Sequence, residues 1–88
     1  VVIATIEKRG PKLIGNPDII SRGFSYMKEN KELIEETRHR VKKLVHDHIK
    51  ASPPDANYIK NQIRDTIGQF LFQRTQRRPM VLPVVIEV

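Results

Sequence analysis

Cysteine is absent from this 88-residue sequence, and its absence excludes two common ways of stabilising a small domain. Without thiols the chain forms no disulfide, and it cannot build a zinc site from thiolates. Any metal would need imidazole or carboxylate ligands. Tryptophan is also absent and aromatic residues make up 6% of the chain, so single-stranded nucleic acid finds few rings on which to stack.

Long hydrophobic runs are missing as well. No apolar stretch approaches the roughly 18 residues that a membrane-spanning helix needs, and no charged segment followed by an apolar one has the pattern of a secretion signal. We therefore expect a soluble protein with no membrane partner. The sequence opens on valine inside an apolar segment, which predicts that residues 1–88 are one small domain of a longer protein.

The charge balance is basic, because 16 Lys and Arg face 10 Asp and Glu, a formal net charge of +6. Two clusters contribute to this surplus, one at a predicted hairpin and one at the end of the second predicted helix, and nucleic-acid phosphates are suitable ligands for both. The candidate nucleic-acid-contacting residues are Lys8, Arg9, Lys12, Arg74, Arg77 and Arg78. The alternative interpretation is that these residues are solvated ends of secondary structure.

Strand patterns lie at both ends of the sequence. Residues 1–6 are almost continuously apolar and mostly β-branched, which is typical of a central strand covered on both faces. A Gly-Pro turn follows, and residues 12–14 can return as a hairpin partner. Residues 15–24 are predicted to be irregular. Residues 80–88 form a last strand whose internal proline, Pro83, predicts an edge position or a bulge.

Helical patterns fill the middle of the sequence. Apolar residues recur at intervals of three and four from Asn30 onward, and again after Asp55, so each of these residues is a candidate helix cap. A serine and two prolines separate the two helices. The fold class predicted by this order is α+β, a two-layer domain in which a three-stranded β-sheet packs on two α-helices in the order β-β-α-α-β.

The predicted sheet is apolar on both of its faces. Alternate residues of the first and last strands are apolar on each side, and two helices cover only one side of a small sheet. An uncovered apolar surface usually marks contact with another protein surface. The sequence thus predicts an assembly role, with these candidate residues for an oligomer or domain interface: Val2, Ala4, Ile6, Val81 and Val85.

No catalytic or metal-binding constellation is recognisable. His46, Asp47 and His48 are potential zinc ligands, but residues two apart on a helix point to opposite sides, so the two imidazoles do not converge. No nucleophile is paired with a base, and no glycine-rich phosphate loop occurs. We expect no catalytic residue, no metal ligand and no cofactor in this chain. Catalysis by residues 1–88 alone is therefore disfavoured.

Two long segments carry a resemblance to a known family. Residues 15–24 read GNPDIISRGF and residues 77–88 read RRPMVLPVVIEV, and the opening VVIATI and residues 70–72, FLF, extend the match over nearly the whole chain. Together they resemble the C-terminal domain of ribonuclease J. The resemblance implies a parent enzyme with a metallo-β-lactamase core and an inserted β-CASP domain. Such an enzyme hydrolyses RNA as an endonuclease and as a 5′-3′ exonuclease, in RNA maturation and decay, with bound zinc.

What the resemblance implies for residues 1–88 is narrower. The family's zinc-binding string, His-x-His-x-Asp-His, has no match here, so zinc is expected in the absent catalytic domain and no site residue carries over. The expected role is a small C-terminal α/β domain that supports dimer or tetramer formation. Its partners would be a second copy and the catalytic domains of its own chain, with RNA bound through the parent. The alternative is a small basic RNA-binding module. The role of residues 21–23 stays open.

Overall fold

The computed structural model describes residues 1–88 except 8, 21–29, 52 and 54. The strands are β1 (Val2–Glu7), β2 (Lys12–Leu13), β3 (Asp18–Ile19) and β4 (Pro83–Glu87), and the helices are α2 (Lys31–Ala51) and α3 (Ala56–Thr75). The predicted α+β fold is confirmed. The predicted strand count and order need one correction, because β3 forms within residues that were expected to be irregular. The described order is β-β-β-α-α-β.

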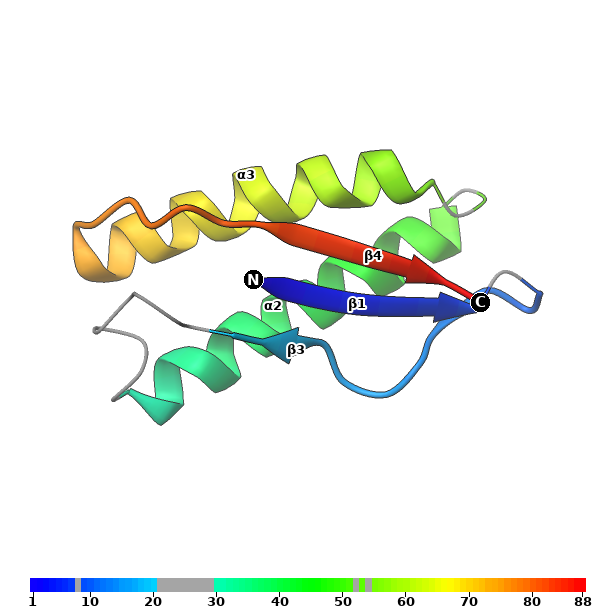
Figure 1. Ribbon diagram of the computed structural model, residues 1–88, viewed down its shortest axis with the longest axis horizontal. Coiled ribbons are helices and arrows are strands. Elements are labelled where there is room, and N and C mark those ends of the chain that lie inside the picture. The colour runs from blue at the N-terminus through cyan, green and yellow to red at the C-terminus, as the bar shows by residue number, and fades with distance from the viewer. Residues whose placement is uncertain (8, 21–29, 52, 54) are drawn as a thin grey trace.

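The sheet is organised around β1. On one edge β1 pairs in parallel with β4, from Val2 opposite Pro83 to Ile6 opposite Glu87. On the other edge it pairs antiparallel with β2 near its end and with β3 near its start. β2 and β3 contribute two residues each, so they act as two halves of one interrupted neighbour. The central position predicted for the first strand is confirmed (Figure 1).

Pro83 is accommodated because β4 is an edge strand. The Leu82 carbonyl accepts from the Val2 amide at 3.0 Å, and the Val88 amide donates to the Ile6 carbonyl at 3.0 Å. Backbone groups of alternate residues point to the same edge of a strand. Pro83 therefore turns towards the other edge, where its missing N–H costs no hydrogen bond to β1. Within the described residues β4 pairs with β1 alone, so of the two predicted alternatives, an edge position or a bulge, the edge position applies.

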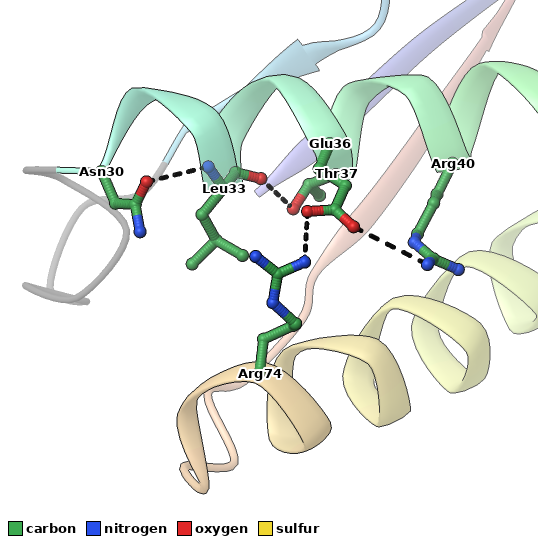
Figure 2. Close-up of polar contacts among 6 residues, drawn as sticks. All are labelled: Asn30, Leu33, Glu36, Thr37, Arg40 and Arg74. Atoms are coloured by element: carbon green, nitrogen blue, oxygen red, sulfur yellow. Dashed lines mark hydrogen bonds and ion pairs between the residues drawn. The ribbon is translucent and has the colours of Figure 1, made fainter.

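Both predicted helix caps are present. The Asn30 Oδ1 accepts a hydrogen bond from the Leu33 amide at 3.0 Å (Figure 2), and the Asp55 Oδ1 accepts one from the Tyr58 amide at 3.2 Å. Each cap satisfies an amide that has no partner inside its helix. At its far end α3 closes on Gln76, whose φ of 60° is left-handed and whose amide donates to the Phe72 carbonyl at 2.7 Å. A residue other than glycine holds this position at a small conformational cost.

The two helices lie side by side and cover one face of the sheet, while no described segment covers the other face, which lies in front in Figure 1. One stripe of each helix packs beneath the strands, as the periodicity predicted. The buried hydrophobic core consists of Val2, Ala4, Ile6, Leu13, Leu33, Val41, Val45, Ile59, Ile63, Ile67, Phe70 and Leu71. Thr37 is also buried, and its hydroxyl donates to the Leu33 carbonyl at 2.8 Å, so this polar group is satisfied inside the core (Figure 2).

An ion pair ties the two helices together at one end. Glu36 of α2 pairs with Arg74 of α3, and its other oxygen lies 3.8 Å from Arg40 (Figure 2). Both arginines also lie over the Phe70 ring, with Arg40 at 4.2 Å and Arg74 at 5.8 Å from its centroid. A cation over an aromatic face adds a modest attraction to the packing of the helices.

Candidate functional site

The two faces of β1 have different environments. Val2, Ala4 and Ile6 point to the helices and are almost completely buried, with Ala4 and Ile6 at 0% exposure. Ile3 and Thr5 point to the other side and are half-buried. This alternation follows from the twofold side-chain period of a strand. The face that another protein surface can reach is therefore the one that carries Ile3 and Thr5.

This placement corrects the choice of interface residues made from the sequence. Val2, Ala4 and Ile6 belong to the core beneath the helices, and Val81 and Val85 are half-buried hydrophobic residues that pack against that core. These five side chains are engaged within the domain, so they do not form its exposed apolar surface. The expectation of an apolar sheet face without cover still describes the opposite side of the same strands.

We call that opposite side the outer sheet face. Its position follows from register, since residues paired across neighbouring strands point to the same side. Ile3 pairs with Val84 and Thr5 with Ile86, and the backbone hydrogen bonds continue the same pattern beyond the strand ends. The outer sheet face comprises Val1, Ile3, Thr5, Ile14, Ile20, Leu82, Val84, Ile86 and Val88.

The outer sheet face is apolar and accessible to solvent. Val84 is 40% exposed, Ile86 44% and Val88 63%. Val1, Ile14, Ile20 and Leu82 are also exposed large hydrophobic residues. Exposed aliphatic side chains are ordinary when they are scattered, but here they share one side of one sheet. Such a contiguous surface is typical of a protein contact site.

Polar groups of this face lie at its margins. Glu7 pairs with Lys12 at 3.6 Å from Nζ to Oε2, at the end of β1 where the hairpin begins. Asp18 lies opposite Ile3 on the interrupted edge and is exposed. An apolar centre with a polar rim is the usual anatomy of a protein interface.

The predicted basic clusters do not form one surface. Arg9 and Lys12 flank the hairpin that follows β1, whereas Arg74 belongs to the last turn of α3. These two regions lie at opposite ends of the long axis, which extends 37 Å (Figure 1). Lys8 lies outside the described residues. An RNA-binding module built on all six candidate residues as one patch therefore lacks the geometry it requires.

Several members of these clusters are engaged within the chain. Arg74 pairs with Glu36 (Figure 2), Lys12 pairs with Glu7, and the Arg78 guanidinium lies 4.6 Å from the Phe72 ring centroid. Arg77 is exposed, and its amide donates to the Thr75 hydroxyl at 3.1 Å. These contacts support the interpretation of the cations as partners of local structure.

Among the histidines of α2, His48 makes contacts that support the local structure. His48 stacks on Tyr58 with ring centroids 4.8 Å apart, and its Nε2 accepts from the Asp55 amide at 3.2 Å. This contact joins the end of α2 to the start of α3. Over the described part of the chain, no group of three or more histidine, cysteine, aspartate or glutamate side chains is arranged to hold a metal ion.

One signal in the sequence distinguishes the outer sheet face from the core face. In the first strand the polar residues, Thr5 and Glu7, occupy odd positions, together with Val1 and Ile3. A side that contains polar residues is the side nearer to water. The even positions carry only apolar residues, among them the small Ala4, and these face the helices.

The fold and this surface define a class of protein: a small α+β module in which one apolar face of the sheet is exposed, with no cover from the segments that the structure describes. Sequence comparison gives the family. The family model for the Ribonuclease J C-terminal domain matches residues 1–88. The chain belongs to that family, and the resemblance seen in the sequence is confirmed.

Named relatives agree with this assignment. The chain is 34% identical over 88 residues to Ribonuclease J2 of Bacillus subtilis and to a Ribonuclease J 2 of Staphylococcus epidermidis, and 32% identical to a Ribonuclease J 2 of Staphylococcus aureus. Each match covers 100% of this chain and 16% of the relative. The chain therefore spans a small part of the length of these relatives. Among the helices described, neither has the length and apolar character that crossing a membrane requires.

Proposed function

We propose that this chain is the non-catalytic C-terminal domain of a ribonuclease J type enzyme and that it supports assembly of that enzyme into a dimer or tetramer. The outer sheet face is the observation that carries the proposal. Its apolar side chains point away from the core, and no described segment of the chain covers them. Burying this surface against a second copy removes it from water, which is the main driving force of association.

A second copy suits the outer sheet face for geometric reasons. In a twofold assembly the same patch meets itself, so an apolar centre meets an apolar centre and the polar rims also face each other. Sheets that pack face to face interdigitate aliphatic side chains at a separation of about 10 Å. The β-branched residues in the middle of the face, Ile3, Val84 and Ile86, are suited to such packing.

The chemistry of the parent is proposed to lie outside this chain. The named relatives are ribonucleases, and 84% of the length of each, that is 100 minus 16, is not matched by residues 1–88. RNA cleavage, the zinc that supports it and the cytoplasmic location belong to the proposal for the whole enzyme. The described residues do not fit a zinc site, so we assign them no catalytic step.

Light scattering after size-exclusion chromatography tests this function. The unmodified chain is measured over a range of concentrations and at two salt concentrations. We expect a mass near twice 10.2 kDa at the higher concentrations, with little dependence on salt because the contact is apolar. A mass of 10.2 kDa at every concentration would contradict self-association and would instead favour docking of the outer sheet face on the catalytic domains of the same enzyme.

A further inference from the structure

The charges of α2 are segregated along its length. Residues 31–37 carry one basic and three acidic residues, a net charge of −2, whereas residues 38–50 carry five basic residues and one acidic residue, a net charge of +4. The sum over both halves is +2, so the net charge of the helix does not show this division. The second half of α2 is therefore strongly basic, although the net charge of the whole helix is small.

Two of the four acidic residues of α2 pair with arginines. Glu35 pairs with Arg38, and Glu36 pairs with Arg40 and Arg74. The lysines of the second half differ. No ion pair or hydrogen bond of Lys42, Lys43 or Lys50 is found among the described residues, and all three are exposed. The internal ion pairs thus leave the lysines, not the arginines, as the charges available to a ligand.

These lysines lie along one exposed side of α2. His39, Lys43, His46 and Lys50 follow at intervals of four, three and four residues, so they form one row, and Lys42 lies beside it. We call these five residues the α2 basic stripe. The core residues of α2 follow a different row, which begins at Leu33 and ends at Val45. The stripe therefore lies on the side of α2 that faces away from the core. Because α2 covers the face of the sheet opposite to the outer sheet face (Figure 1), the stripe and the outer sheet face lie on opposite sides of the domain.

The helix dipole accounts for only part of this charge. Its attraction for cations falls off within the last turn, which in α2 contains Lys50. Lys42 and Lys43 lie two turns or more before the end at Ala51. From Lys42 to Lys50 the stripe rises about 12 Å at 1.5 Å per residue. A nucleic-acid strand with a rise of about 3.4 Å per nucleotide presents about three phosphates over that length.

We propose that the α2 basic stripe contacts the phosphate backbone of RNA, with Lys42, Lys43 and Lys50 as the contacting residues. The choice of RNA rests on the proposed function, in which the parent enzyme acts on RNA. The stripe and the outer sheet face lie on opposite sides of the domain, so one domain engages a second copy and an RNA strand at the same time. Assembly then multiplies the number of phosphate-binding stripes on one particle.

Binding of a labelled single-stranded RNA to the chain is measured over a series of salt concentrations. The variant Lys42→Gln/Lys43→Gln/Lys50→Gln removes the three charges and keeps good helix formers. We expect the slope of log affinity against log salt to decrease in magnitude by about 2, and affinity at 0.1 M salt to fall about 100-fold, as loss of three phosphate contacts requires.

The control variant, Arg9→Gln/Lys12→Gln/Arg77→Gln, removes the same number of charges from the two ends of the domain. We expect it to bind RNA almost as well as the unmodified chain. An equal loss in both variants would overturn the proposal, because binding would then depend on net charge alone. Absence of salt-dependent RNA binding by the unmodified chain would overturn it as well. Neither result bears on self-association, which is read from the mass of the chain.

Discussion

The two faces of the sheet are made of similar residues, but only one of them is buried within the domain. On the helix side, Val2, Ala4 and Ile6 are buried by the chain itself. On the outer side, Ile3, Val84 and their neighbours are equally aliphatic, and no described segment covers them. Hydrophobic composition therefore shows that burial of a surface is favourable, but it does not show which molecule buries it. The helices decide which face becomes core, and the remaining face is left for another molecule.

The largest effect is expected from a substitution on the face of the sheet that packs against the helices. Ile6→Asp places a charge without a partner at a position of 0% exposure in the hydrophobic core. Such a charge costs at least about 4 kcal/mol, close to the whole stability of a small domain. We expect the variant to be unfolded by circular dichroism at room temperature. A cooperative thermal transition like that of the unmodified chain would show that Ile6 is not in the core.

The matched change on the outer side should leave the fold intact. Val84→Asp/Ile86→Asp introduces two charges at half-exposed positions on the edge strand, where water solvates them in the monomer. In a twofold contact each charge counts twice, so we expect association to weaken by at least about 100-fold. Light scattering should then give 10.2 kDa. The variant Val84→Thr/Ile86→Thr, which keeps the β-branched shape, should weaken association less.

Removing a helix cap tests whether association depends on the stability of the fold. Asp55→Ala removes the carboxylate that accepts from the Tyr58 amide and touches neither face of the sheet. We expect a loss of about 1 kcal/mol in the free energy of unfolding, measured in urea. Below its transition the variant should associate as the unmodified chain does. Dissociation of this folded variant would mean that association depends on general stability and not on the outer sheet face.

The smallest expected effect is an increase in the stability of the fold. Gln76 ends α3 with a φ of 60°, a left-handed conformation that costs a side-chain-bearing residue about 1 kcal/mol. Gln76→Gly removes this cost. Glycine also increases the conformational entropy of the unfolded chain, which offsets part of the stabilisation. We expect a net stabilisation of about 0.5 kcal/mol in thermal unfolding, with no change in mass. A lower midpoint would show that the Gln76 side chain contributes more than its backbone costs.

The helices and their caps were predictable because their signals are local. The row of apolar residues, Asn30 and Asp55 all lie within the segments that they organise. Pro83 limited β4 to an edge position or a bulge, and only the pairing of the folded sheet decides between the two. β3 was not predictable, since its two residues become a strand only by pairing with Val2 and Ile3 of β1. That pairing depends on where the rest of the chain lies.

The sequence predicted the type of the candidate site, an exposed apolar sheet face, but not the residues that form it. Alternating apolar positions predicted a sheet with one face left uncovered, yet the choice between the faces depends on where the helices pack. Thr5 and Glu7 mark the outer side, a signal weaker than the apolar residues around them. The separation of the hairpin that follows β1 from the last turn of α3 is likewise a tertiary property (Figure 1). No local pattern places the hairpin and the end of α3 at opposite ends of the domain.

The most direct test of the central claim is the distance between identical spin labels in two copies of the chain. Because the chain has no cysteine, Thr5→Cys labels the centre of the outer sheet face and His39→Cys labels the far side of α2, each at one site. Facing sheets lie about 10 Å apart, and the two helix layers add about 20 Å. We predict a shorter distance for the Thr5 label than for the His39 label, by about 20 Å. A shorter distance for His39, or no coupling between copies, would contradict assembly through the outer sheet face.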